Sequence, residues 1–130
     1  SERDRATANC VLHYADQHHP LLILVECTTE LQSWGPAVPG RRKVGDGSTY
    51  RWWLREITKL GYEHKVLYLN SMFFGVGQSR DRGYWVFWDK RLPAPDLTRR
   101  PDGKVHLLRV RMPVGLHMFS LSRTMPLCTL

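Results

Sequence analysis

The sequence has few cysteines and no long apolar run, and both absences narrow the classes of protein to which it can belong. Its three cysteines, Cys10, Cys27 and Cys128, are far apart and odd in number, which argues against a disulfide framework and fits a reducing compartment. The chain has no Cys-x-x-Cys pair and no two histidines at i, i+4 spacing, so no metal site is predicted. The longest aliphatic run has five residues, whereas a membrane-spanning helix needs about 20. We therefore expect a soluble cytoplasmic protein with no membrane partner.

The length of 130 residues allows one modest core, so we expect one domain or a piece of one. The formal net charge of +7 invites a nucleic-acid partner, but residues 99–130 alone carry six basic side chains and one acidic one. This basic tail shows no clean helical or strand period. It could be an unrelated extension, a divergent continuation or a segment translated in a shifted frame. We therefore divide the chain after residue 98 and assign no function to residues 99–130.

Two stretches have helical periodicity. In residues 2–19, apolar side chains recur at i, i+3, i+4 and i+7, and Pro20 then stops the helix. A second helix, which Ser48 or Thr49 can cap, ends just before Gly61. Its apolar stripe consists of Tyr50, Trp53, Leu54, Ile57 and Leu60. We expect this stripe, its tryptophan included, to pack in the core.

Three stretches are predicted to be strands. Residues 21–26 contain the uninterrupted aliphatic run, which is typical of a strand buried on both faces. Residues 64–70 follow the second helix, and the two strands of such a strand–helix–strand unit should run parallel. Residues 84–88 come after a connection too short for another crossover, so they should pair antiparallel, most simply with residues 64–70. The sequence thus predicts a three-layer α/β fold with an antiparallel edge hairpin.

The first candidate site lies at the end of the aliphatic strand. Glu26 ends this strand, and ligands of open α/β sheets bind at the carboxyl ends of strands; a solvated strand end is the alternative. Cys27 has no adjacent base in the sequence, so we expect a small, half-buried side chain rather than a nucleophile. The long loop of residues 34–48 should border the same site. Its basic triplet consists of Arg41, Arg42 and Lys43. The triplet could contact phosphates or form a solvated charge run.

The second candidate site is the turn between the last two predicted strands. Gly75 and Gly77 permit backbone angles that are closed to other residues. Gln78, Arg80 and Arg82 alternate, so they would share one face of an extended backbone. Arginine offers a rigid fork of donors for phosphate, carboxylate or a base edge, while glutamine both donates and accepts. The alternative is a solvated hairpin turn.

Together these two sites resemble motifs of the DNA (cytosine-5) methyltransferases. The late motif of that family is an asparagine, four residues, and then Gly-x-Pro-Gln-x-Arg-x-Arg before a strand. The chain matches this motif at Asn70, Gly75, Gln78, Arg80 and Arg82. Gly77 stands where the family usually has proline. Residues 26–28, Glu-Cys-Thr, stand at the family's Glu-Asn-Val site, of which only the glutamate is kept. The resemblance covers about residues 3–97, and the two sites occur in the family's order.

The resemblance implies that residues 1–98 are a partial catalytic domain with a Rossmann-like fold. Such a domain acts on double-stranded DNA and takes its methyl group from S-adenosylmethionine. Glu26 would share a proton with ring nitrogen 3 of a cytosine flipped out of the duplex, while Arg80 and Arg82 would hold its carbonyl edge. The expected substrate-binding residues are Asn70, Gln78, Arg41, Arg42 and Lys43. The expected cell is a bacterium or a phage-infected host.

Two parts of the family are absent from the sequence. No Pro-Cys pair occurs, so the nucleophile is missing, and no glycine-rich loop follows an early strand to cradle the cofactor. Both would precede Ser1, so the chain resembles the second half of a catalytic domain, which should transfer no methyl group alone. The alternatives are a non-catalytic DNA-binding or accessory domain derived from such an enzyme, and a nonfunctional remnant.

Overall fold

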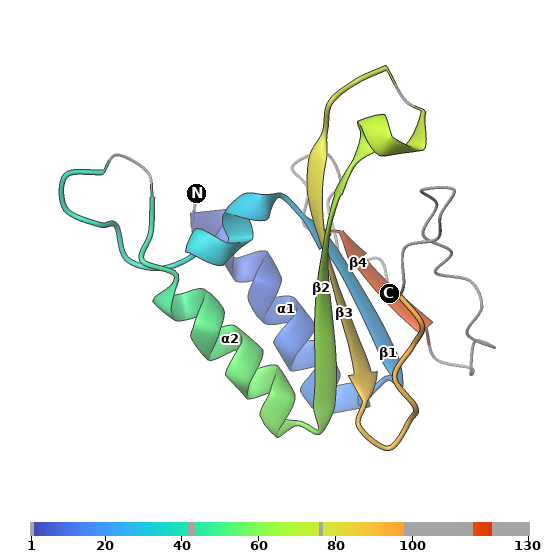
Figure 1. Ribbon diagram of the computed structural model, residues 1–130. Helices are drawn as coiled ribbons and strands as arrows, with labels where there is room; N and C mark the ends of the chain where they lie inside the picture. Colours follow the sequence, from blue (N-terminus) through green and yellow to red (C-terminus); the bar gives the residue numbers. More distant parts are fainter. Residues whose placement is uncertain (1, 42–43, 76, 98–115, 121–130) are drawn as a thin grey trace.

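A computed structural model describes residues 2–41, 44–75, 77–97 and 116–120 of the chain (Figure 1). In chain order the elements are α1 (Glu2–His18), β1 (Leu22–Cys27), the short 3-10 helix η1 (Thr29–Ser33), α2 (Ser48–Lys59), β2 (Tyr62–Asn70), a second 3-10 helix η2 (Ser71–Phe74), β3 (Asp81–Asp89) and β4 (Leu116–Ser120). The described residues therefore form a mixed α/β structure, as the sequence predicted. Each predicted helix and strand is present, with shifted ends.

The strands form a single sheet in the order β2-β3-β1-β4. β3 pairs antiparallel with both β2 and β1, so β1 and β2 run in the same direction although they are not neighbours. The predicted parallel orientation of the first two strands and the predicted pairing of residues 64–70 with residues 84–88 are both confirmed. β2 lies at one edge, and it forms with β3 the expected edge hairpin. β3 itself lies inside the sheet, because β1 covers its other side.

Both helices pack on one face of the sheet (Figure 1). Ile23 and Val25 of β1 point toward the helices and are completely buried. Trp53 of α2 lies among them, also completely buried, and its Nε1–H donates a hydrogen bond of 2.8 Å to the carbonyl oxygen of Ala8 in α1. This bond satisfies the polar atom of a core tryptophan and joins the two helices. The prediction that the stripe of α2 belongs to the core is confirmed.

The opposite face of the sheet carries a smaller apolar cluster. It consists of buried Val86, Trp88 and Leu97, with Leu22, Leu24 and Leu67 packed against them. β1 thus contributes apolar side chains to both faces, as its uninterrupted aliphatic run predicted. Within the described residues both helices lie on the other face, so these residues form two layers rather than the expected three. The Rossmann-like arrangement therefore stays a prediction.

Several element ends differ from the prediction for identifiable reasons. The first helix ends at His18, because His19 adopts a left-handed φ of 43° that interrupts the helix. The residue that caps α2 is Gly47, with φ 73°, so the assignment of the cap to Ser48 or Thr49 was wrong. The side chain that serves this end is Asp46, whose Oδ1 accepts a 2.8 Å hydrogen bond from the backbone N–H of Ser48.

The sheet is larger than the sequence predicted, because β3 starts earlier and a fourth strand is present. β3 begins at Asp81, so Arg82 lies in a strand and not in the preceding turn. β4 pairs parallel with β1, although it comes from the tail to which the sequence assigned no structure. The rest of that tail, residues 99–115 and 121–130, lies outside the described residues. One strand of the tail therefore belongs to the same sheet as residues 22–89.

Candidate functional site

Glu26 and Arg82 come together on the sheet face that points away from the helices. Glu26 lies opposite Tyr84 in the β1–β3 register, and Arg82 is two residues from Tyr84 along the same strand, so all three side chains share a face. Leu22 and Leu24, on the same face of β1, pack in the smaller apolar cluster beside them. Two residues far apart in the sequence are thus neighbours at the carboxyl end of β1.

The two side chains form a half-buried ion pair. Arg82 Nε lies 2.8 Å from Glu26 Oε1, and the exposed fractions of the side chains are 20% and 18%. Arg82 Nε is buried but makes no hydrogen bond in the part of the chain that the structure describes, because its N–H does not point at the carboxylate. Nε and Oε1 are therefore held together by charge and proximity rather than by an aligned hydrogen bond.

The turn between β2 and β3 is organised by Asn70. Its side-chain oxygen accepts a 2.9 Å hydrogen bond from the backbone N–H of Met72, and its side-chain nitrogen donates to Ser79 Oγ at 3.0 Å and to Asp81 Oδ1 at 2.8 Å. Gly75 ends η2 with a left-handed φ of 79°, which a glycine adopts without strain. The motif asparagine and glycine therefore shape the turn, and the side-chain oxygen and nitrogen of Asn70 both form hydrogen bonds within it.

Gln78 and Arg80 lie in the same turn with exposed side chains. Their backbone carbonyls are used by Ser71, whose hydroxyl donates to the carbonyl of Gln78 and whose N–H donates to the carbonyl of Arg80 at 3.1 Å. Both side chains remain directed to solvent next to the strand that carries Arg82. The expected meeting of Arg80 with Glu26 and Arg82 stays a prediction.

Arg41, the residue of the basic triplet that the structure describes, lies elsewhere. The loop that carries Arg41 projects beyond the first turn of α2 (Figure 1), on the helix side of the sheet, whereas Glu26 and Arg82 face the other side. Arg41 is exposed, and Arg42 and Lys43 lie outside the described residues. The expected position of this loop beside Glu26 therefore stays a prediction.

Cys27 is buried on the helix face of β1, with 8% of its surface exposed. Burial raises the pKa of its thiol, which favours the thiol over the reactive thiolate. Cys27 also points to the opposite face from Glu26, because successive side chains of a strand alternate. It is more buried than the sequence indicated, and both observations argue against its use as the nucleophile.

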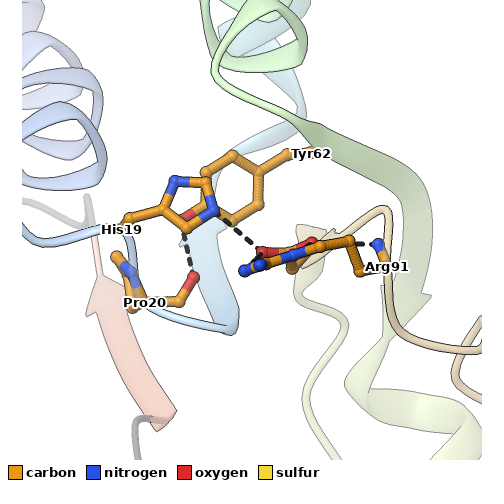
Figure 2. Close-up of polar contacts among 5 residues, drawn as sticks. His19, Pro20, Tyr62 and Arg91 are labelled. Carbon is orange, nitrogen blue, oxygen red and sulfur yellow. Dashed lines mark hydrogen bonds and ion pairs between the residues drawn. The ribbon is translucent and has the colours of Figure 1, made fainter.

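A second polar cluster, which sequence reasoning missed, lies at the other end of the sheet around Asp89 (Figure 2). Only 2% of the Asp89 side chain is exposed. Arg91 donates to it three times: its backbone N–H and Nε bond Oδ1 at 2.9 and 3.0 Å, and Nη2 bonds Oδ2 at 2.7 Å. His19 Nε2 lies 2.9 Å from the same Oδ2. The hydrogen bonds from Arg91 hold the pKa of Asp89 well below its usual range.

Tyr62 completes this cluster. Its ring lies against His19, with centroids 4.8 Å apart, and its hydroxyl donates to the carbonyl oxygen of Pro20 at 2.5 Å. Burial and the charge of Asp89 raise the pKa of Tyr62 to about 12. The cluster fastens the ends of α1, β2 and β3 to one another. Because its polar atoms are directed at each other, we interpret it as a structural junction.

No group of three or more histidine, cysteine, aspartate or glutamate side chains gathers as a metal site within the described ranges. Over those same residues, no helix has the length and apolar character that a bilayer crossing requires. No protein-family model and no curated protein sequence matches the chain. The functional proposal therefore depends on the geometry of Glu26 and Arg82.

Proposed function

We propose that the chain is the second half of the catalytic domain of a DNA cytosine-5 methyltransferase. In the complete enzyme, S-adenosylmethionine would supply a methyl group to carbon 5 of a cytosine flipped out of duplex DNA. Glu26 and Arg82 would hold that cytosine. The observation that carries the proposal is their 2.8 Å ion pair, because it joins the two motifs on which the resemblance depends.

The chemistry of the pair suits a cytosine. A carboxylate can share a proton with ring nitrogen 3, and a guanidinium can donate to the carbonyl oxygen next to it. Arg82 has donors besides Nε, so one arginine can contact both the carboxylate and a base. Their half-buried position also favours binding, because a base that covers the pair would remove water from both charges and strengthen their interactions with it.

The order of the strands adds a second, weaker support. Doubly wound methyltransferases have an antiparallel strand near one edge of the sheet, and here antiparallel β3 is next to the edge strand β2. Glu26 lies at the carboxyl end of β1, which is the usual side for ligands in open α/β sheets. A shared fold element is an analogy and carries less weight than the ion pair itself.

A binding measurement tests the proposal. Fluorescence anisotropy would compare a duplex that contains one mispaired cytosine with the fully paired duplex, since a mispaired base is cheaper to flip. We expect tighter binding of the mispaired duplex and a loss of about tenfold in Arg82→Ala, because a charged hydrogen bond contributes about 1.5–3 kcal/mol. Arg55→Ala, which removes an exposed arginine of α2, is the matched control. Equal binding of both duplexes, or an unaffected Arg82→Ala variant, would overturn the assignment.

A methyl-transfer assay separates the half-domain from a complete enzyme. Incubation of the chain with duplex DNA and labelled S-adenosylmethionine should give no incorporation, because the sequence has no Pro-Cys pair and covalent catalysis needs its nucleophile. Incorporation that disappears in Cys27→Ala would show that the nucleophile was misplaced.

The missing Pro-Cys pair also favours a second candidate, a non-catalytic DNA-binding or accessory domain. Such a domain would bind DNA through phosphate contacts, which carry no preference for one base. Strong salt-dependent binding with no preference for the mispaired cytosine, unchanged by Arg82→Ala, would favour this candidate.

A further inference from the structure

The outer edge of β2 carries unpaired backbone groups. Two hydrogen bonds flank the strand, from Ser71 N to Arg80 O at 3.1 Å and from Lys90 N to Gly61 O at 2.9 Å. In an antiparallel ladder such bonded pairs recur at every second residue, so the odd-numbered residues of β2 bond to β3. The even-numbered residues, Tyr62, His64, Val66 and Tyr68, therefore direct their N–H and C=O groups away from the sheet. Among the described residues, no backbone hydrogen bond outside the β2–β3 ladder uses them.

This edge lacks two of the features that normally protect a sheet from further pairing, a proline and a bulge, and its charged side chains, Glu63 and Lys65, have opposite signs. β2 spans nine residues without a proline, and its register with β3 runs from Tyr62 opposite Asp89 to Asn70 opposite Asp81 without a bulge. Residues 63–65 are exposed, and β2 is the strand nearest the viewer in Figure 1, with α2 beside it on one face only. An edge of this length, with a continuous register and no neighbouring strand on its outer side among the described residues, is a template for another strand.

We propose that β2 pairs antiparallel with β2 of a second copy of this chain, around a twofold axis at His64, so that one sheet continues across a homodimer. In this register Glu63 lies opposite Lys65 of the second copy, and Lys65 lies opposite its Glu63. These are the close, non-hydrogen-bonded positions of the ladder, with about 4.5 Å between Cα atoms, where opposite charges stabilise pairing.

The two charges select this register over its neighbours. Moving the axis by one residue toward Lys65 places Lys65 opposite itself, and moving it toward Glu63 places Glu63 opposite itself. Both shifts still pair the backbone groups of the even-numbered residues. They replace the attraction between Glu63 and Lys65 by repulsion between like charges. The side chains of Glu63 and Lys65 point to the sheet face away from the helices, so the helices of the two copies do not obstruct their contact.

The proposed ladder contains enough backbone hydrogen bonds to hold two copies together, and its symmetry limits the assembly to a dimer. Three residue pairs would each exchange two backbone hydrogen bonds: Tyr62 with Val66, His64 with His64, and Val66 with Tyr62. Because both copies use the same strand, the contact is isologous and stops at two copies. The proposal does not depend on the methyltransferase assignment, since it uses neither Glu26 nor Arg82.

Charge exchange at the two positions tests the register, with sedimentation equilibrium of the full chain as the measurement. Glu63→Lys and Lys65→Glu each place like charges opposite one another twice, so each should weaken dimerisation about tenfold or more. The double variant Glu63→Lys/Lys65→Glu restores both attractive pairs and should dimerise as the original chain does. A mixture of the two single variants should form a heterodimer. Lys59→Glu changes the charge at an exposed position of α2 and should leave the dimerisation constant unchanged.

Circular dichroism establishes that each variant is folded, which is expected because Glu63 and Lys65 are exposed. A chain that stays monomeric at about 100 μM would overturn the proposal, since even weak specific interfaces reach Kd values of that order. Dimers that are indifferent to both single substitutions, or single variants that do not associate with each other when mixed, would place the contact elsewhere and overturn it equally.

Discussion

The two ends of β3 carry polar clusters that are built in different ways. At one end Asp89 is almost fully buried, and each of its oxygens has two nitrogen partners, from Arg91 and His19. At the other end about a fifth of the side chain of Arg82, and of that of Glu26, is exposed to solvent. The buried Nε–H of Arg82 is not aligned with Glu26 Oε1. Residues 82 and 89 are about 23 Å apart along the strand, at about 3.3 Å per residue, so the clusters are independent of one another.

We interpret this difference as a division of roles between a structural cluster and a proposed binding site. A buried charge whose hydrogen-bonding capacity is filled by its own chain stabilises the fold and has nothing left for a ligand. A half-buried pair contributes less to stability, and a bound molecule that covers it can interact with both of its charges. We therefore interpret the Asp89 cluster as a structural junction and propose the Glu26–Arg82 pair as a binding site.

The largest expected effect follows from Asp89→Asn. At pH 7 we expect a loss of about 3 kcal/mol in the free energy of unfolding, because the substitution leaves Arg91 and His19 without their shared carboxylate. The pKa of Asp89 is lowered in the folded state, so its stabilising contribution is present above the unfolded pKa of about 3.9 and is lost as the pH falls toward the folded value. Urea unfolding from pH 7 to pH 2 should therefore show the difference from the original chain shrinking below about pH 4.

The control for this measurement is Asp16→Asn, because Asp16 is an exposed aspartate of α1. We expect it to change the free energy of unfolding by less than about 0.5 kcal/mol at any of these pH values. An Asp89→Asn variant as stable as this control, or a difference that does not depend on pH, would mean that the Asp89 cluster is not the stabilising junction.

A smaller effect is expected from Gly83→Ala, next to Arg82 in β3. The ring of Trp85 lies so close to Gly83 that a Cβ atom there would overlap it, and Trp85 is completely buried. We expect a loss of about 1–3 kcal/mol, as for overpacking in a core. Gly77→Ala is the matched control, since a Cβ at that position has no atom within 4 Å. If thermal unfolding gives both variants the same midpoint, the contact between Gly83 and Trp85 does not constrain the strand.

The sequence predicted those features that depend on local pattern. The aliphatic run predicted that β1 is buried on both faces, and the apolar stripe of α2 predicted a helix that packs in the core. Both predictions follow from the burial of apolar side chains. The short connection before β3 required an antiparallel neighbour. Of the candidate site, the sequence singled out Glu26 and Arg82 by their motifs, and their side chains are indeed neighbours.

The features that the sequence missed depend on contacts between distant segments. Asp89 follows Trp88 as an ordinary strand-end aspartate, and only the fold brings His19 within 2.9 Å of it. β4 has no pattern that distinguishes it from its surroundings, and its place is given by its parallel pairing with β1. The cap at Gly47 depends on a left-handed φ of 73°, whereas the sequence offered serine and threonine as more typical caps.

The smallest expected effect on stability comes from Glu26→Gln. The substitution preserves the shape of the side chain and removes its charge, and an ion pair that keeps contact with solvent contributes about 1 kcal/mol or less. Urea unfolding should therefore show a loss of at most about 1 kcal/mol, compared with Glu63→Gln as an exposed glutamate on the same sheet face. A loss as large as that of Asp89→Asn would make Glu26 a second structural junction. The contrast between the two ends of β3 would then disappear, and with it the physical reason to place a binding site at one of them.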